Sequence, residues 1–192
     1  MDNEYIKELF ATLENTEIWS GISRKCESYD AGIRLLIDFF TRHKEKQSWL
    51  FFIGNGGSSA IASHMTADYM KNGGMNTYSL YDNAVTTCMG NDYGYESIFS
   101  RPMEFLMRRG DLLVAISSSG NSANIIKAIE TAKAKAAEVI TLTGFSPDNR
   151  AKQMGDINIY VPCGKYGIVE SIHNLILQQI VDGIMERDGV QL

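Results

Sequence analysis

The sequence is poor in cysteine, and its few cysteines stand far apart. The three cysteines are Cys26, Cys88 and Cys163, and no two of them form a CxxC pair. An odd number of widely spaced cysteines does not build a disulfide framework, and without paired cysteines a structural zinc knot is not indicated. We therefore expect three buried free thiols.

The chain also lacks a long hydrophobic run. Its longest apolar stretches, such as residues 49–53, are far shorter than the roughly 20 residues that a membrane-spanning helix needs. The first four residues, Met-Asp-Asn-Glu, do not show the basic and then apolar segments of a secretory signal. We therefore expect a cytoplasmic protein that does not enter a membrane.

Positive charge is scarce as well. The chain has 18 Lys and Arg against 23 Asp and Glu, a formal net charge of -5. The basic residues form no cluster larger than short pairs such as Arg108-Arg109. This composition disfavours binding to nucleic acid or to an anionic membrane, and leaves only a local basic patch open.

What the sequence does contain is enough apolar material for one domain. With 192 residues, of which 44% are hydrophobic, and no internal repeat or linker, residues 1–192 are expected to form a single domain. Residues 1–46 hold no proline and repeat apolar residues at three- and four-residue steps, which predicts two helices, the second one long. These helices would cap the domain or pack against copies of themselves in an oligomer. The repeating positions are Tyr5, Leu9, Leu13, Ile22, Cys26, Tyr29, Ile33, Leu36, Ile37 and Phe40.

Beyond residue 46 the pattern changes to short apolar runs. The first four runs are each followed by a turn rich in Gly, Ser, Asn or Asp and then by a helical segment. This alternation predicts an α/β fold in which helices cover both faces of a parallel sheet. The five runs are 49–53, 77–80, 112–116, 139–142 and 157–161.

A serine-rich turn stands between the run at 112–116 and a helix expected at 123–134. It has the sequence Ser-Ser-Ser-Gly-Asn-Ser over residues 117–122. The first turn of a helix leaves backbone N–H groups unpaired and carries partial positive charge, so this place suits an anion. Nearby hydroxyls add donors that carry no charge. The pattern favours a cradle for a phosphate group.

A similar loop follows the first apolar run. It has the sequence Gly-Asn-Gly-Gly-Ser-Ser over residues 54–59 and leads into a helix expected at 58–71. Ligands of open parallel sheets gather at the carboxyl ends of the strands, so both loops should face one crevice. Ordinary strand-to-helix turns also favour Gly and Ser, and that interpretation stays open. A dinucleotide loop would need glycine where Ser59 stands, and a nucleoside triphosphate loop would need a Gly-Lys-Ser/Thr that follows neither turn.

Five motifs in order are similar to those of one known family. Their order and spacing resemble the sugar isomerase (SIS) domain of phosphoheptose isomerases over nearly the whole chain. The motifs are Gly54-Asn55-Gly56-Gly57-Ser58, Gly90-Asn91-Asp92-Tyr93-Gly94, Ile-Ser-Ser-Ser-Gly-Asn-Ser-Ala-Asn at 116–124, Val-Ile-Thr-Leu-Thr-Gly at 139–144, and Glu170-Ser171-Ile172-His173.

The resemblance implies a fold, an assembly and an activity. The fold is a three-layer αβα sandwich with a five-stranded parallel sheet, and the assembly is a homotetramer with sites between subunits. The activity is isomerisation of sedoheptulose 7-phosphate to D-glycero-D-manno-heptose 7-phosphate, with the serine turn holding the phosphate. The implied substrate-binding residues are Asn55, Gly56, Gly57, Ser58, Asn91, Asp92, Ser117, Ser118, Ser119, Ser122 and Gln178.

A histidine and a carboxylate share one face of the helix expected after the first loop. His64 and Asp68 are four residues apart. Such a pair can bind zinc, form an acid–base pair or sit in a polar seam. In the resembled family the matching positions are a His and a Glu near a metal, with the carboxylate as candidate base. Asp68 is one methylene shorter, which sets the carboxylate back by about 1 Å.

The C-terminal helix, expected at about 166–186, carries Glu170 and His173 three residues apart. The family has a Gln where Glu170 stands and a proton-transferring His where this chain has Gln178. Glutamine does not exchange a proton at neutral pH, so the family's acid–base pair is not reproduced. Eight residues of helix rise about 12 Å, so Glu170 and Gln178 need not serve the same copy of the site.

Two interpretations of these departures stand. In the first, Glu170 compensates: together with His64, Asp68 and Gln178 it holds a divalent metal, with zinc as the expected ion, in an active aldose–ketose isomerase. Asp68 or Glu170 is then the base, and His173 supports the site or relays a proton. Simpler roles also stay open: Glu170 can favour the N-terminal turn of its helix, and His173 can be a core histidine bonded to a carbonyl group. In the second, the fold binds a phosphosugar without turning it over and acts as a sensor or scaffold. We favour the isomerase, because binding alone gives no reason to combine Glu170 with His64 and Asp68.

Overall fold

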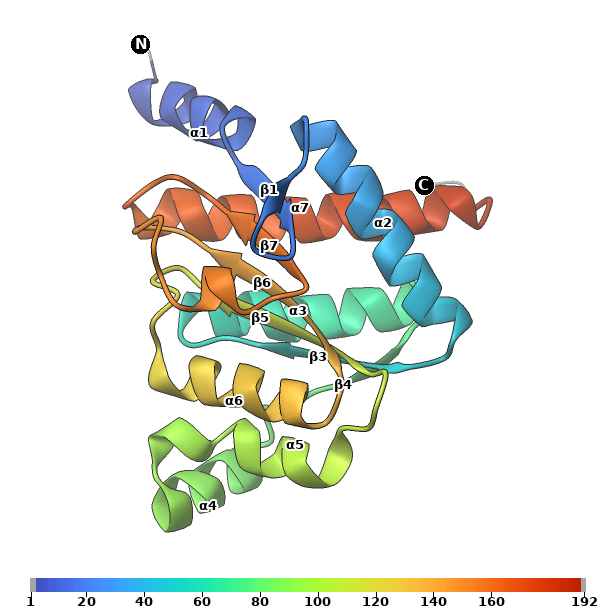
Figure 1. Ribbon diagram of the computed structural model, residues 1–192, viewed down its shortest axis with the longest axis vertical. Helices are drawn as coiled ribbons and strands as arrows, with labels where there is room; N and C mark the ends of the chain where they lie inside the picture. Colours follow the sequence, from blue (N-terminus) through green and yellow to red (C-terminus); the bar gives the residue numbers. More distant parts are fainter. Residues whose placement is uncertain (1–2, 191–192) are drawn as a thin grey trace.

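In the computed structural model, which describes residues 3–190, a seven-stranded mixed sheet lies between two layers of helices (Figure 1). Five strands are parallel neighbours in the order β7-β6-β5-β3-β4. They match the five apolar runs of the sequence, so the predicted parallel sheet is confirmed. Their bounds are β3 (Trp49–Ile53), β4 (Asn76–Tyr78), β5 (Leu112–Ser117), β6 (Glu138–Thr143) and β7 (Ile157–Tyr160).

The N-terminal region contains the two predicted helices, the second one longer, but an unpredicted hairpin lies between them. A hairpin of β1 (Glu17–Ser20) and β2 (Arg24–Lys25) separates α1 (Glu4–Glu14) from α2 (Tyr29–Glu45). Strand β1 runs antiparallel to β7 and extends the sheet at that edge, so the sheet has two strands more than expected. The hairpin turns at Gly21, whose φ of 62° suits glycine. Ile22 and Cys26 therefore match the helical spacing by coincidence.

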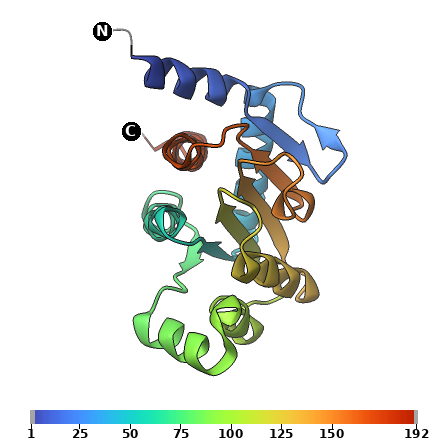
Figure 2. The same cartoon turned by 90° about the vertical axis from the view of Figure 1, so that its left-hand side faces the viewer.

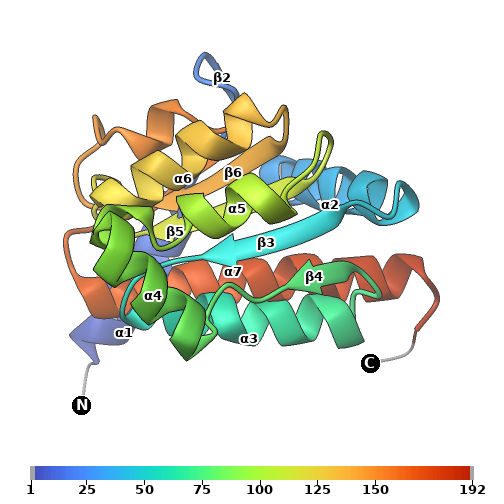
Figure 3. The same cartoon turned by 90° about the horizontal axis from the view of Figure 1, so that it is seen from below.

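The helices cover both faces of the sheet, as predicted. Figures 2 and 3 show α3 (Gly57–Lys71) and α7 (Tyr166–Arg187) side by side on one face. With α2 they bury one apolar cluster against residues such as Phe52 and Val114. Helices α5 (Ser100–Leu106) and α6 (Ala123–Ala134) bury the second cluster on the opposite face. Because both faces are covered, the central strands have continuous apolar runs rather than an alternation.

Helix α4 (Asn83–Tyr93) lies outside these layers, at the lower end of Figure 1. None of its residues is buried. Two short 3-10 helices, η1 (Tyr95–Ser97) and η2 (Ala151–Gln153), complete the described elements. Helix α4 therefore contributes little to the core of a single chain.

The strand order creates a crevice between β3 and β5. These two strands are neighbours, but α3 follows β3 on one face of the sheet and α6 follows β5 on the other. The chain therefore leaves the sheet in opposite directions at their carboxyl ends. Open α/β sheets bind ligands at such a point. The two glycine- and serine-rich loops both begin there.

Two expectations from composition can be compared with the described residues. All three cysteines are free, but Cys88 is exposed and the other two are half-buried, so the expectation of three buried thiols is wrong. Cys88 is exposed because it lies on α4. Among the helices of residues 3–190, none combines the length and the hydropathy needed to cross a membrane.

Candidate active site

A pocket of about 260 Å³ lies at the crevice between β3 and β5. Both predicted loops line it, together with the first turns of α7. The structure thus brings together three segments that are far apart in the sequence. The lining residues are Asn55, Gly56, Gly57, Ser58, Ile116, Ser117, Ser118, Ser119, Ser122, Tyr166 and Glu170.

The serine turn presents several unused hydrogen-bond donors to this pocket. Ser118 is buried, and within the described structure its hydroxyl has no hydrogen-bond partner. Ser122 is the N-cap residue of α6, yet its side chain makes no capping bond. The N–H of Ile125 donates to Asn124 Oδ1 at 3.0 Å, so the N–H groups of the first two helical residues stay available. An oxyanion placed here would meet hydroxyl donors and the positive end of the α6 dipole. These features support the predicted phosphate cradle.

The turn itself is tightly folded. The backbone N–H of Gly120 donates to the carbonyl oxygen of Ser117 at 2.9 Å, and Gly120 has a φ of 63°. A residue with a side chain rarely adopts this backbone conformation. The sequence Ser-Ser-Ser-Gly therefore sets the shape of the turn as well as its donors.

The first loop supplies an amide whose orientation is fixed. The Asn55 carboxamide exchanges two hydrogen bonds with the buried carboxamide of Asn124, at 2.9 and 2.8 Å. The Tyr95 hydroxyl also donates to Asn55 Oδ1 at 3.1 Å. Below the loop, the hydroxyl of Tyr81 bonds both the N–H and the carbonyl group of Gly54. Asn55 is thus held at the rim of the pocket.

Glu170 is the acidic residue among those that line the pocket. It lies near the start of α7, and its carboxylate is packed against Gly57 at the start of α3. Any side chain at Gly57 would collide with this carboxylate. Glycine at position 57 therefore makes room for Glu170, and the N-terminus of α3 favours its negative charge.

His64, Asp68 and Gln178 form a second polar cluster, between α3 and the later turns of α7. His64 Nε2 lies 3.2 Å from Asp68 Oδ2. The Gln178 side-chain nitrogen donates to Asp68 Oδ2 at 2.7 Å and lies 3.0 Å from His64 Nε2. The His64 side chain is 54% exposed, so this cluster lies on the surface of the chain. None of the three residues lines the pocket.

The predicted metal set is therefore divided between two places. His64, Asp68 and Gln178 meet, but Glu170 lies at the pocket, and residues 3–190 contain no group of three or more His, Cys, Asp or Glu that could hold a metal ion. The separation follows from the eight residues of helix between Glu170 and Gln178, which rise about 12 Å. One imidazole and one carboxylate, bridged by an amide nitrogen, do not fit a zinc site with three or four protein ligands.

His173 lies in the core rather than in the pocket. It is fully buried, and its Nε2 donates to the carbonyl oxygen of Thr143 at 3.2 Å. Burial disfavours the charged ring and lowers the pKa of His173 from 6.5 to about 4, although the bond to Thr143 opposes this shift. Its proposed role in proton relay is corrected, because α7 turns this side chain toward the sheet.

Asn91 and Asp92 also lie away from the pocket. Both are exposed on α4, where the Asn91 amide donates to Asp92 Oδ1 at 2.8 Å. Neither residue lines the pocket within this chain. The nearest link from this region is Tyr95, which reaches Asn55. The expectation that Asn91 and Asp92 hold the sugar is thus not met by a single chain.

The sequence interpretation missed three residues of the site. Asn124 orients Asn55, while Ile116 and Tyr166 line the pocket. Asn124 belongs to the serine motif and sits one residue inside α6, where an asparagine, a poor helix former, was a usable signal of a side-chain role. Tyr166 carries no comparable signal, because an aromatic residue at a helix start has many roles.

Comparison with known proteins agrees with this geometry. The family model described as "SIS domain" matches residues 15–144. Phosphoheptose isomerase of Sodalis glossinidius strain morsitans is 36% identical over 181 residues, covering 88% of this chain and 91% of that protein. Phosphoheptose isomerase of Enterobacter sp. strain 638 is 41% identical over 144 residues, covering 72% and 74%.

A solved structure shows the same fold. Phosphoheptose isomerase from Neisseria gonorrhoeae superimposes with a TM-score of 0.81 at 28% sequence identity, covering 97% of this chain and 96% of that one. The match spans nearly the full length of both chains, so it includes the N-terminal helices as well as the sheet. With the pocket, the two loops and these similarities in agreement, the chain belongs to the SIS domain family and, within it, to the phosphoheptose isomerases.

Proposed function

We propose that this protein is an aldose–ketose isomerase that converts sedoheptulose 7-phosphate to D-glycero-D-manno-heptose 7-phosphate. The observation that carries the proposal is the pocket itself, in which neutral phosphate donors and the carboxylate of Glu170 face the same space. The relatives of the chain are phosphoheptose isomerases, which favours this reaction over a binding protein without activity.

The phosphate is held by neutral groups in this mechanism. The hydroxyls of the serine turn and the first N–H groups of α6 donate to its oxygens, and no Lys or Arg is among the residues that line the pocket. The unpartnered hydroxyl of Ser118 gains a hydrogen bond when phosphate arrives. Binding energy from the phosphate then fixes the sugar carbons against the catalytic groups.

Glu170 is the base that we assign to this pocket. It takes a proton from C1 of the ketose while the C2 oxygen takes a proton from solvent water, which gives an enediol. The same carboxyl group returns its proton to C2, and the C1 hydroxyl gives its proton back to the solvent as the aldehyde forms. The Asn55 amide, held by Asn124 and Tyr95, is placed to donate to the oxygen on which negative charge develops.

We further propose that the exposed cluster of His64, Asp68 and Gln178 completes the site of another subunit in a homotetramer. Two apolar side chains on the same helices support this assembly: Met70 of α3 is 54% exposed and Leu175 of α7 is 44% exposed. An interface over this face would bury both. Size-exclusion chromatography with light scattering tests it, and a monomer at working concentration would refute it.

A divalent ion at His64 and Asp68 stays a prediction of the resemblance, and no step above depends on it. The donor atoms present in one chain do not fit such an ion, because the amide nitrogen of Gln178 occupies the space between them. Zinc content after purification with and without added zinc is the direct measurement. The cytoplasmic location also stays a prediction, which fractionation of cells would test.

One experiment tests the reaction. Purified protein is incubated with sedoheptulose 7-phosphate in deuterated water and followed by proton NMR. We expect an aldose product, with solvent deuterium at C2, because a carboxylate base exchanges its proton with solvent. Binding of the sugar phosphate without product and without exchange would refute the isomerase and favour the phosphosugar sensor.

A further inference from the structure

The loop after β6 braces the serine turn from outside the pocket. We define residues 144–152 as the bracing loop. The N–H of Gly144 donates to Ser118 O at 3.0 Å, and the N–H of Ala151 donates to Gly120 O at 2.9 Å. These two bonds hold the backbone of the turn at Ser118 and at Gly120. The bracing loop itself contributes no residue to the pocket lining.

Asn149 is the centre of the bracing loop. Its side chain is buried, with 2% exposure, and donates to Ser146 O at 2.8 Å and to Gly144 O at 3.3 Å. Its Oδ1 accepts from the N–H of Lys152 at 3.0 Å. Three hydrogen bonds thus close the loop around one carboxamide.

The same carboxamide lies directly against the serine turn. A Cβ atom on Gly120 would collide with the Asn149 side chain, so the two residues are in close contact. Gly120 is also the position at which the turn has its positive φ. Asn149 therefore supports the turn at its most constrained residue.

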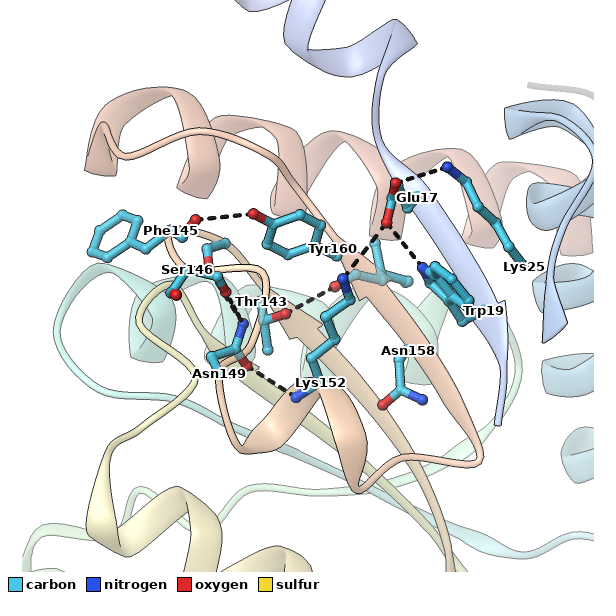
Figure 4. Close-up of polar contacts among 12 residues, drawn as sticks. Glu17, Trp19, Lys25, Thr143, Phe145, Ser146, Asn149, Lys152, Asn158 and Tyr160 are labelled. Carbon is cyan, nitrogen blue, oxygen red and sulfur yellow. Dashed lines mark hydrogen bonds and ion pairs between the residues drawn. The ribbon is translucent and has the colours of Figure 1, made fainter. Parts of the chain in front are cut away.

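Lys152, at the other end of the bracing loop, contacts the N-terminal hairpin (Figure 4). Its ammonium group lies 4.0 Å from the ring centroid of Tyr160 and 5.5 Å from that of Trp19. It also lies 3.6 Å from Glu17 Oε2, and its side chain is only 14% exposed. A cation between two aromatic faces and a carboxylate, largely shielded from water, is held more firmly than one at an open surface.

Glu17 is held in turn by the hairpin. Lys25 Nζ donates to Glu17 Oε1 at 2.7 Å, and Trp19 Nε1 donates to Oε2 at 3.1 Å. Burial alone would raise the pKa of Glu17, but these bonds and the nearby lysine charges lower it on balance. The carboxylate thus stays charged and keeps Lys152 in place near neutral pH.

We propose that Asn149 is a positioning residue for phosphate binding, and that the Lys152 contacts extend this support to the N-terminal hairpin. The inference rests on the proposed function, because it assigns the serine turn to a phosphate. Several hydroxyls and N–H groups must converge on one phosphate, and a turn that is already fixed loses less conformational freedom on binding. Asn149 acts only through the turn and does not touch the ligand.

The test compares Asn149 with a matched buried asparagine. Asn158 is fully buried, accepts from Thr141 Oγ1 at 2.7 Å and donates to Gly21 O at 2.8 Å. It does not line the pocket, and its side-chain hydrogen bonds join Thr141, Gly155 and Gly21 rather than the serine turn. Asn149→Ala and Asn158→Ala should therefore lower the melting temperature by similar amounts, because each leaves buried backbone groups unpaired.

The two variants should differ in phosphate affinity. We expect Asn149→Ala to raise the Kd for inorganic phosphate, measured by calorimetry, about tenfold, and Asn158→Ala to leave it within about twofold. In the isomerase assay, Asn149→Ala should raise KM by a similar factor and change kcat much less. Lys152→Met keeps the apolar stem and should raise the Kd about threefold, which provides a milder variant if Asn149→Ala does not fold.

The possible outcomes distinguish the positioning role of Asn149 from the proposed function of the pocket. If wild type binds phosphate and neither Asn149→Ala nor Lys152→Met weakens binding, the positioning role is refuted while the proposed function stands. An equal loss of affinity in Asn158→Ala would also refute it, since the effect would then follow stability alone. Wild type that binds no phosphate would refute both the phosphate site and its brace.

Discussion

Two parts of α7 contribute to chemistry in different ways. At its start, Glu170 faces a pocket whose other walls come from the same chain. Eight residues later, Gln178 joins His64 and Asp68 on an open surface where the His64 side chain is 54% exposed. Under the proposed function, a single chain supplies the phosphate-binding part of the site, and the exposed cluster is shielded from water only by a further subunit.

The largest expected effect comes from removing the carboxylate at the enclosed part. Glu170→Gln keeps the size of the side chain but cannot take a proton, so we expect kcat to fall by about 10²- to 10⁴-fold. Phosphate affinity should stay nearly unchanged, because the serine turn is intact. Steady-state kinetics and phosphate calorimetry measure the two quantities.

Asp68→Asn is the matched change at the open part of the helix. A smaller loss than in Glu170→Gln would agree with Glu170 as the base. A loss of turnover in Asp68→Asn alone would contradict this assignment and move the base to the open cluster, facing the pocket of a neighbouring subunit.

His173 lies between the two parts of α7, and its burial against the sheet should make the stability of the protein depend on pH. Its folded pKa of about 4 is below the ordinary value of 6.5, so the unfolded chain binds more protons between these values. The free energy of unfolding should therefore be highest above pH 6.5. It should decrease by on the order of 3 kcal/mol as the pH falls toward 4.

The measurement is urea unfolding at a series of pH values. His173→Gln can keep the donor to Thr143 O without a titrating ring, so its free energy of unfolding should decrease less over the same window. Equal pH dependence in wild type and variant would contradict the buried, neutral state of His173.

Gln178→His tests whether the exposed cluster of His64, Asp68 and Gln178 can be turned into a metal site. It places a second imidazole beside His64 and Asp68, which then form a set of three strong metal donors. We expect zinc affinity to rise by on the order of tenfold or more, measured by competition with a chromophoric chelator. Stoichiometric zinc in purified wild type would show instead that Gln178 already permits a metal site.

The last change is at the serine turn. Ser118→Ala removes a hydroxyl that has no partner in the described structure, so the melting temperature should change little. The Kd for phosphate should rise about tenfold, because a hydrogen bond to a charged ligand is lost.

Thr77→Val is the control for Ser118→Ala. The Thr77 hydroxyl is also buried but donates to Thr66 O at 2.8 Å. This variant should lose about 1 kcal/mol of stability and keep the phosphate affinity. The opposite pattern in the two variants would show that the Ser118 hydroxyl serves the fold and not the ligand.

Much of the fold was predictable from the sequence because its signals are local. The helix expected at 123–134 is found as α6 with the same bounds, and the helix expected at 58–71 is found as α3 from residue 57. Continuous apolar runs identify strands that are covered on both faces. The hairpin at 17–25 was missed, because its strands are short and β1 pairs with β7, which lies far away in the sequence.

The residues of the candidate site were also predictable only in part. The spacing of His64 and Asp68 predicted their proximity, and the structure gives 3.2 Å. The spacing of Glu170 and His173 could not show that one faces a pocket and the other the core. That difference depends on how α7 is rotated against the sheet, which its own sequence does not specify.

The sequence by itself indicated the five strands, the helices after them and the serine turn with its donors, since apolar runs, turn residues and helical spacing are local signals. Only the tertiary structure decided that Gln178 and not Glu170 joins His64 and Asp68, that His173 is buried, and that Asn149 supports the turn. These outcomes depend on the packing of segments distant in sequence, where a helix rotation of one residue exchanges a pocket for a core.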